Sequence, residues 1–222
     1  GTLAAARRIS STRHETLALN MLGVVAQMRG HHQTARERYD EALAAATRGG
    51  DPALMGFMLN IVGNFQYANA EFAGAIDAFH RALGMDISRE NAAFLRSNLG
   101  AAYLAVGDLD AADAILREAI DASERMGLNF ILAEAGIRRG GVTAARGDIA
   151  AGLAAIERGC TLARAIGATE PLTEGLLRRG ELLAAADPGA ARLALEEAKA
   201  LAEKDGLGDL LAKTAAALSR LP

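Results

Sequence analysis

Small and large apolar residues recur along this chain at a spacing typical of paired helices. The recurrence is aligned on five glycines, separated by 40, 37, 40 and 40 residues: Gly23, Gly63, Gly100, Gly140 and Gly180. A small, a large apolar and a second small residue follow each of them, as Ala75, Phe79 and Ala82 follow Gly63. In the fifth unit the series comes one residue early and begins at Ala191. Because small residues at fixed positions let two helices approach closely, each unit is predicted to be a helical hairpin.

Glycine and proline mark where the predicted helices end. In Gly107-Asp108 and Gly147-Asp148, a glycine that ends one helix is followed by an aspartate that caps the next. Pro52 and Pro188 each follow an aspartate, which is typical of a first helical residue, and Pro171 is expected just ahead of a helix. The second helices of four units are predicted to end in glycine turns, at Gly49-Gly50, Gly127, Gly167 and Gly206.

Composition favours an all-helical protein. The 222 residues are 51% hydrophobic but only 4% aromatic, with no tryptophan. A core of small side chains suits closely packed helices and suits a β-sandwich poorly. The net charge of -3 gives no electrostatic reason to expect nucleic acid or a membrane as a partner. Arginine outnumbers lysine 21 to 3, which is typical of a GC-rich bacterial genome.

Residues that carry chemistry are sparse. The single cysteine, Cys160, excludes an intrachain disulfide and is expected to fill a packing position. None of the four histidines stands in a metal-ligand pattern, and phosphate-binding and serine-nucleophile motifs are absent. No catalytic residue, metal or cofactor is predicted, and the chain is not expected to be an enzyme. Without a secretory signal or an apolar run of about 18 residues, it is expected to be soluble and cytoplasmic.

The aligned glycine, the small-large-small series and the hairpin period resemble the tetratricopeptide repeat (TPR), with a longer unit than the usual 34 residues or so. The resemblance covers residues 13–205 and departs from the family at Arg139 and Arg179, where an apolar residue is usual. It implies an all-α fold, a right-handed α-solenoid of five TPR-like helical hairpins plus flanking helices.

The same resemblance predicts one superhelical domain over residues 1–222. Residues 1–12 are expected to end an upstream repeat, with a helix at 3–9, residues 13–205 to form the five repeats, and residues 206–222 to form a C-terminal capping helix over 209–221. The chain is therefore interpreted as a fragment of a larger bacterial protein, with about twelve helices in all.

In this family the first helices of the hairpins line a concave groove. Mapped onto this sequence, the groove positions are predicted to be Leu17, Asn20, Val24, Gln27, Phe57, Asn60, Asn64, Tyr67, Phe94, Ser97, Asn98 and Arg138. Amide side chains donate and accept hydrogen bonds, so a row of them suits an extended peptide backbone. Phe57, Tyr67 and Phe94 are expected to supply pockets, with packing against neighbouring hairpins as the alternative.

Charged residues in the later first helices have two interpretations. Arg138-Arg139 and Arg178-Arg179 repeat at one spacing, and they either form a basic stripe or are solvated or paired with acids such as Glu134 and Glu174. Some family members capture a chaperone's C-terminal carboxylate through two lysines, two asparagines and an arginine. Here Asn64, Asn98 and Arg138 match, but Asn60 and Glu134 stand at the lysine positions, so carboxylate capture is not expected.

Together these features predict a non-catalytic scaffold that binds a peptide or protein segment in the concave groove, as part of a bacterial regulatory or signalling protein. The alternative is a structural module that associates with itself through its terminal helices, and an exposed apolar patch on residues 209–221 would favour it.

Overall fold

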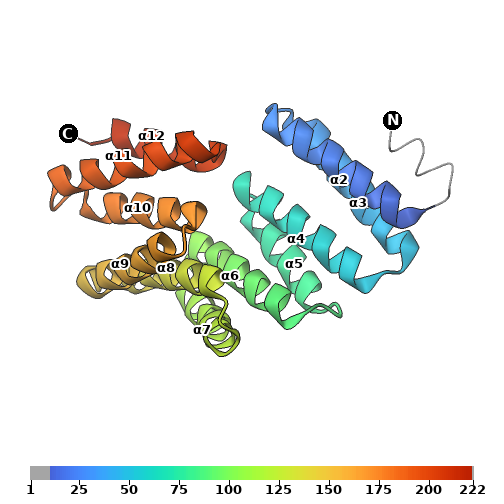
Figure 1. Ribbon diagram of the computed structural model, residues 1–222, viewed down its shortest axis with the longest axis horizontal. Coiled ribbons are helices and arrows are strands. Elements are labelled where there is room, and N and C mark those ends of the chain that lie inside the picture. Colours follow the sequence, from blue (N-terminus) through green and yellow to red (C-terminus); the bar gives the residue numbers. More distant parts are fainter. Residues whose placement is uncertain (1–10, 222) are drawn as a thin grey trace. The chain divides into compact units, whose positions relative to one another are not determined.

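The computed structural model describes residues 11–221, and every regular element in them is an α-helix (Figure 1). The helices are α2 (Thr12–Met28), α3 (His32–Gly49), α4 (Pro52–Ala68), α5 (Phe72–Leu83), α6 (Arg89–Val106), α7 (Leu109–Met126), α8 (Asn129–Ala145), α9 (Ile149–Ala165), α10 (Thr169–Leu183), α11 (Pro188–Asp205) and α12 (Gly208–Ser219). The predicted all-α class and the order of five hairpins, α2–α3 to α10–α11, are confirmed. The helix expected at residues 3–9 lies outside the described residues.

The described chain forms two compact units, residues 11–95 and residues 96–221, with the boundary inside α6. The first unit holds the α2–α3 and α4–α5 hairpins and the start of α6, and the second holds the rest of α6, α7, the α8–α9 and α10–α11 hairpins and α12. That the two units form one superhelical domain stays a prediction.

The aligned glycines lie where each hairpin is tightest. A methyl group placed on Gly23 would lie 2.5 Å from Cε1 of Tyr39, and one on Gly63 would lie 2.6 Å from Cε1 of Phe79. The remaining three glycines meet the large residue of their own second helix in the same way: Gly100 meets Leu116, Gly140 meets Ile156 and Gly180 meets Leu195. All five of these large side chains are buried. The register predicted from the glycine and alanine columns is confirmed in every hairpin.

Helix ends follow the capping rules, with one correction. The side chains of Asp51, Asp108, Asp148 and Asp187 each accept a hydrogen bond from a backbone N–H in the first turn of their helix. At the equivalent of the glycine turns, Ala70 adopts a φ of 60°, a conformation that costs a residue with a side chain more than glycine. The placement of Pro171 ahead of a helix is wrong, because α10 begins at Thr169. The first helical N–H groups have no partner within the helix, so proline fits that first turn.

The last helix covers the last hairpin. α12 packs on α10 and α11, where Ala217 shares a buried cluster with Leu177 and Leu195. It begins one residue before the predicted range and ends two residues earlier.

Candidate functional site

The first unit carries an uncharged helical face. Residues 16–28 of α2 and all of α4 contain no acidic or basic residue. Six large apolar side chains on these two segments are nevertheless exposed: Leu17, Met21, Leu22, Val25 and Met28 on α2, and Phe57 on α4. We call these six residues the uncharged face. Neighbouring exposed apolar side chains are typical of surfaces that other molecules cover.

Packing within the first unit explains why these side chains point outward. Leu19 and Ala26 of α2 join Met58 and Phe65 of α4 in one buried cluster, which fixes the inner sides of both helices. Arg13 Nη1 lies 3.3 Å from Asp51 Oδ2, so the amino ends of α2 and α4 are adjacent. Leu17 and Phe57, forty residues apart, hold equivalent positions in successive hairpins.

The groove residues predicted in the first unit differ in their availability. Leu17 and Phe57 are 40% and 43% exposed, and Asn64 is also exposed. Val24, Gln27, Asn60, Tyr67 and Phe94 are partly buried. The Tyr39 hydroxyl donates a 2.8 Å hydrogen bond to Gln27 Oε1, and the Tyr67 ring lies 5.6 Å from that of Phe72. Two of the expected ligand contacts are therefore also contacts within the hairpins.

Asn20 departs from the expectation most clearly in this unit. It is only 8% exposed, and its Oδ1 is buried without a hydrogen-bond partner in the structure. The α2 backbone turns this position toward the inner side of the helix, so the Asn20 amide is covered where an open groove position was expected.

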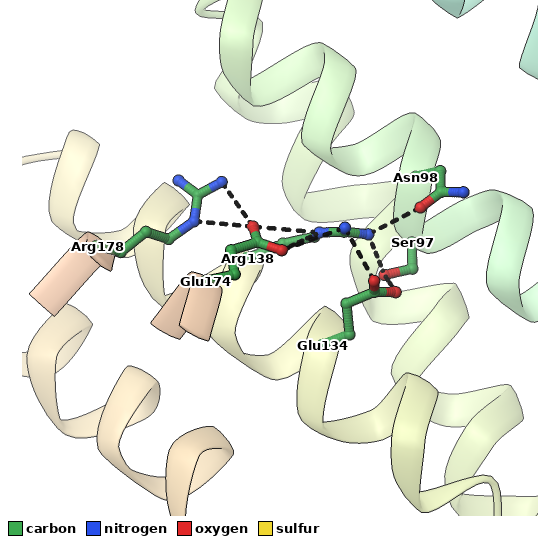
Figure 2. Close-up of polar contacts among 6 residues, drawn as sticks. All are labelled: Ser97, Asn98, Glu134, Arg138, Glu174 and Arg178. Carbon is green, nitrogen blue, oxygen red and sulfur yellow. Dashed lines mark hydrogen bonds and ion pairs between the residues drawn. The ribbon is translucent and has the colours of Figure 1, made fainter. Parts of the chain in front are cut away.

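In the second unit, the predicted groove positions belong to a network of ions (Figure 2). Arg138 lies at its centre, and Glu134 and Glu174 lie on either side of its guanidinium group. Arg138 Nη2 lies 2.9 Å from Glu134 Oε1 and 3.2 Å from Glu174 Oε2. Arg178 donates to Glu174 Oε1 from Nε and Nη2, at 3.1 and 2.9 Å. Two carboxylates and two guanidinium groups thus alternate along α8 and α10.

Two neutral side chains of α6 complete this network. Arg138 Nη1 donates hydrogen bonds to Ser97 Oγ at 2.9 Å and to Asn98 Oδ1 at 3.1 Å. The Ser97 hydroxyl in turn donates to Glu134 Oε2 at 2.9 Å. Ser97, Asn98, Glu134 and Arg138 are all buried. The three predicted groove residues among them are therefore bonded to one another, because ions on adjacent helices satisfy each other when they leave water.

The two glutamates of the network differ in their pKa. Burial raises the pKa of Glu134 to about 7, although Arg138 acts in the opposite direction, and the nearby Glu174 raises it further. Burial also acts to raise the pKa of Glu174, but Arg138 and Arg178 outweigh it and lower that pKa to about 2. Glu174, held between two guanidinium groups, is therefore the more firmly ionised carboxylate.

A pH-dependent stability follows from Glu134. Because its pKa is raised above the unfolded value, its protonation stabilises the folded state, and this contribution is lost as pH rises from about 5 to 8. We expect Glu134→Gln to remove a pH-dependent change of on the order of 3 kcal/mol in the free energy of unfolding across that range. Urea denaturation at several pH values measures it. The control is Glu118→Gln, since the Glu118 side chain is 61% exposed; equal slopes for the parent and Glu134→Gln would contradict the assignment.

Ion pairing also decides between the two interpretations of the arginine pairs. Arg138 and Arg178 bond Glu134 and Glu174, Arg139 Nε lies 2.8 Å from Asp113 Oδ1, and Arg179 Nη1 lies 3.4 Å from Glu157 Oε2. The paired alternative is confirmed, and the four arginines do not form a bare basic stripe. The network that joins these ions was not predicted from the sequence. Its signal was a glutamate four residues before an arginine, present at 134 and 138 and again at 174 and 178.

Metal and nucleophile sites find no support within residues 11–221. No group of three or more histidine, cysteine, aspartate or glutamate side chains there is placed to hold a metal ion. Cys160 is buried, and burial raises the pKa of its thiol to about 11, as the packing role predicts. No helix in the described range combines the length and hydropathy needed to cross a bilayer.

The fold matches solved structures, although no family model and no curated protein matches the sequence. BtubC from P. vanneervenii has a TM-score of 0.68 at 18% identity, over 92% of this chain and 88% of that one. The Rap conjugation gene regulator of plasmid pLS20, in complex with the Phr* peptide, has a TM-score of 0.75 at 16% identity, over 93% of this chain and 59% of that one.

A third structure names the repeat. The signal transduction ATPase with a tetratricopeptide repeat sensor from Pyrococcus horikoshii has a TM-score of 0.65 at 14% identity, over 97% of this chain and 32% of that one. These matches agree with the hairpin register and the buried glycine contacts. The chain has the tetratricopeptide-repeat fold.

Proposed function

We propose that this chain is a non-catalytic scaffold that binds a peptide or protein segment on the uncharged face of its first unit. The observation that carries the proposal is the exposure of six large apolar side chains on two helix segments that contain no charged residue. A surface of this kind gains free energy when another molecule removes it from water. Asn60 and Asn64 of α4 add amides beside it, which suit a peptide backbone.

The contrast between the two units supports this location over the longer groove expected at first. In the second unit, Ser97, Asn98 and Arg138 are buried and bonded within the chain. A ligand there would have to break a buried ionic network before it formed any contact of its own. In the first unit, Leu17 and Phe57 are open to solvent, and binding requires no ion pair to separate.

The setting we propose is a regulatory or signalling protein in the bacterial cytoplasm. Support comes from the similar Rap regulator, whose structure holds a Phr* peptide, and from the similar ATPase, whose TPR part is called a sensor. The alternative of self-association through the C-terminal helix has less support, because the large apolar residues of α12, Leu210, Leu211 and Leu218, are partly buried.

Peptides selected on the full chain from a random display library test the proposal. We expect the selected peptides to lose at least about tenfold in affinity for the Leu17→Ala/Phe57→Ala variant, since both truncations remove exposed apolar anchors. Phe130→Ala is the matched control, because Phe130 is a similarly exposed aromatic residue (38%) on α8 of the second unit. Isothermal titration calorimetry measures both. Peptides that respond to Phe130→Ala and not to the double variant would place binding elsewhere.

A further inference from the structure

One side of α2 is open to solvent, although the equivalent positions of later helices are buried. Ala18, Leu22 and Val25 lie on this side together, because residues three, four and seven apart share one side of an α-helix. Leu22 and Val25 are 44% and 41% exposed, and Ala18 is partly buried. We call these three residues the outer side of α2.

In the second hairpin, the same three positions are covered by the helix that comes before them. Met58, Val62 and Phe65 of α4 stand forty residues after the outer side of α2, and all three are buried. The Phe65 ring lies 5.3 Å from the ring of Tyr39 in α3. The three α4 residues also share one buried cluster with three alanines in the second half of α3: Ala42, Ala45 and Ala46. An alanine-rich helix face therefore packs against this side of α4.

The fourth hairpin repeats this arrangement within the second unit. Ala135 and Val142 of α8 match Ala18 and Val25 in the repeat register, and both are buried. They share one cluster with residues of α7, the second helix of the preceding hairpin: Ala112, Leu116 and Ala119. Among residues 11–221, no helix comes before α2 to cover its outer side in the same way.

The ten residues before Ser11 have the sequence of such a covering segment. Residues 1–10 and 41–50 are identical at five of ten positions in the forty-residue register, where Leu3, Ala4, Ala5, Ala6 and Arg8 match Leu43, Ala44, Ala45, Ala46 and Arg48. Alanine, leucine and arginine are strong helix formers. The residue that follows caps a first helix in both places, because the Ser11 and Asp51 side chains each accept a hydrogen bond from a backbone N–H of the first turn. The connection to the first helix thus has the same length in both.

We propose that residues 1–10 form a helical segment that packs on the outer side of α2, as the second half of α3 packs on α4. A helix of ten residues is about 15 Å long, which equals the length of α2 from its start to Leu22. The segment therefore covers Ala18 and Leu22. Because Ser11 joins the segment directly to α2, its effective concentration at this surface exceeds that of a second copy.

This inference goes beyond the function proposed above and leaves its site open. Successive residues lie about 100° apart around an α-helix, so Leu17 points away from the side on which Ala18 lies. Of the uncharged face, the segment covers Leu22 and leaves Leu17 and Phe57 to a ligand.

Thiol reactivity in the full chain tests the contact. Ala18→Cys places a thiol beneath the proposed segment, and Met28→Cys places one on the same helix at a position that is 82% exposed. The rate at which 5,5′-dithiobis(2-nitrobenzoic acid) modifies each thiol measures how far it is covered. Cys160 is buried, so the parent chain gives the background rate.

Two substitutions in the segment supply the comparison. Ala5→Glu is expected to displace the segment, because its counterpart Ala45 is fully buried. Ala4→Glu is the matched control, because its counterpart Ala44 is exposed. We expect Ala5→Glu to raise the reaction rate of Ala18→Cys at least about tenfold, and Ala4→Glu to leave it within about twofold. Neither substitution should change the rate of Met28→Cys.

Three results would overturn the inference. They are equal rates for Ala18→Cys with Ala4→Glu and with Ala5→Glu, an Ala18→Cys thiol that reacts as fast as Met28→Cys when residues 1–10 are unchanged, and protection of Ala18→Cys that grows with protein concentration. The last result would assign the outer side of α2 to a second copy. Library-selected peptides that respond to Leu17→Ala/Phe57→Ala would leave the proposed function standing in each case.

Discussion

Replacement of Arg138 by methionine is expected to lower the free energy of unfolding by about 3 to 5 kcal/mol, the range seen when one partner of a buried ion pair is removed. The variant keeps a side chain of similar length but removes the cation between Glu134 and Glu174. Glu134, which is buried, then faces Glu174 without the charge that separates them, and Asn98 loses a donor. Urea denaturation followed by circular dichroism measures the loss.

Two comparisons show whether the network causes that loss. Arg81→Met removes an ion pair with Asp77 whose side chains are 57% and 68% exposed, and is expected to cost less than about 1 kcal/mol. The cost of Arg138→Met should also be smaller at pH 5 than at pH 8, because an unpaired Glu134 is more readily protonated. Equal costs for Arg138→Met and Arg81→Met would show that the buried pairs contribute no more than surface pairs.

The substitution Gly152→Val is expected to destabilise the fourth hairpin by about 3 kcal/mol, the upper part of the range for overpacking. A methyl group on Gly152 would lie 2.7 Å from Cβ of Ala144, and 2.8 Å from both the amide N of Ala144 and the carbonyl O of Gly140. Two of these three atoms belong to the backbone of α8, so a change of rotamer cannot make room. The α8 and α9 helices must move apart, and the midpoint of thermal unfolding reports the change.

Gly136 provides the control within the same hairpin. It lies inside α8, and outside the helix's own backbone no heavy atom comes within 4 Å of the position that a Cβ would occupy. Gly136→Ala is therefore expected to stabilise the protein by about 0.5 to 1 kcal/mol through helix propensity. Gly152→Ala, which adds only the Cβ, is the milder test if the valine variant does not fold. A stability unchanged in Gly152→Ala would contradict the close approach of α8 and α9.

The hairpins were predictable because their cause is local and repeated. A glycine that faces a large residue sixteen positions later, as Gly63 faces Phe79, produces a sequence pattern that can be aligned across the repeat units. Capping aspartates such as Asp108 and Asp148 act on their own first turn, so their role was also readable. Pro171 was misplaced because the first helical turn accepts proline at more than one position.

The state of the candidate site was less predictable, because it depends on which side chains bond across helices. Ser97 and Arg138 occupy positions where the family has ligand contacts, but α6, α8 and α10 bring them together with Glu134 and Glu174. The contacts between hairpins join residues 36 to 41 positions apart, and no local pattern gives their distances. The solvent exposure of single side chains was equally hard to predict. The sequence placed Leu17 and Asn20 on one surface, whereas Leu17 is exposed and Asn20 is buried.

The ionic network has a direction along the chain. Glu174 and Arg178 stand forty residues after Glu134 and Arg138, so a glutamate and an arginine recur at the same places in successive hairpins. Forty residues further on, α12 has Thr214 and Leu218 instead, and the Thr214 hydroxyl donates to Leu210 O within its own helix. The glutamate and arginine of the series therefore do not recur at these two positions of α12. An array lengthened by a copy of residues 168–207 ahead of α12 would gain one more glutamate and arginine at these two positions, so engineered repeats can extend the ionic network one hairpin at a time.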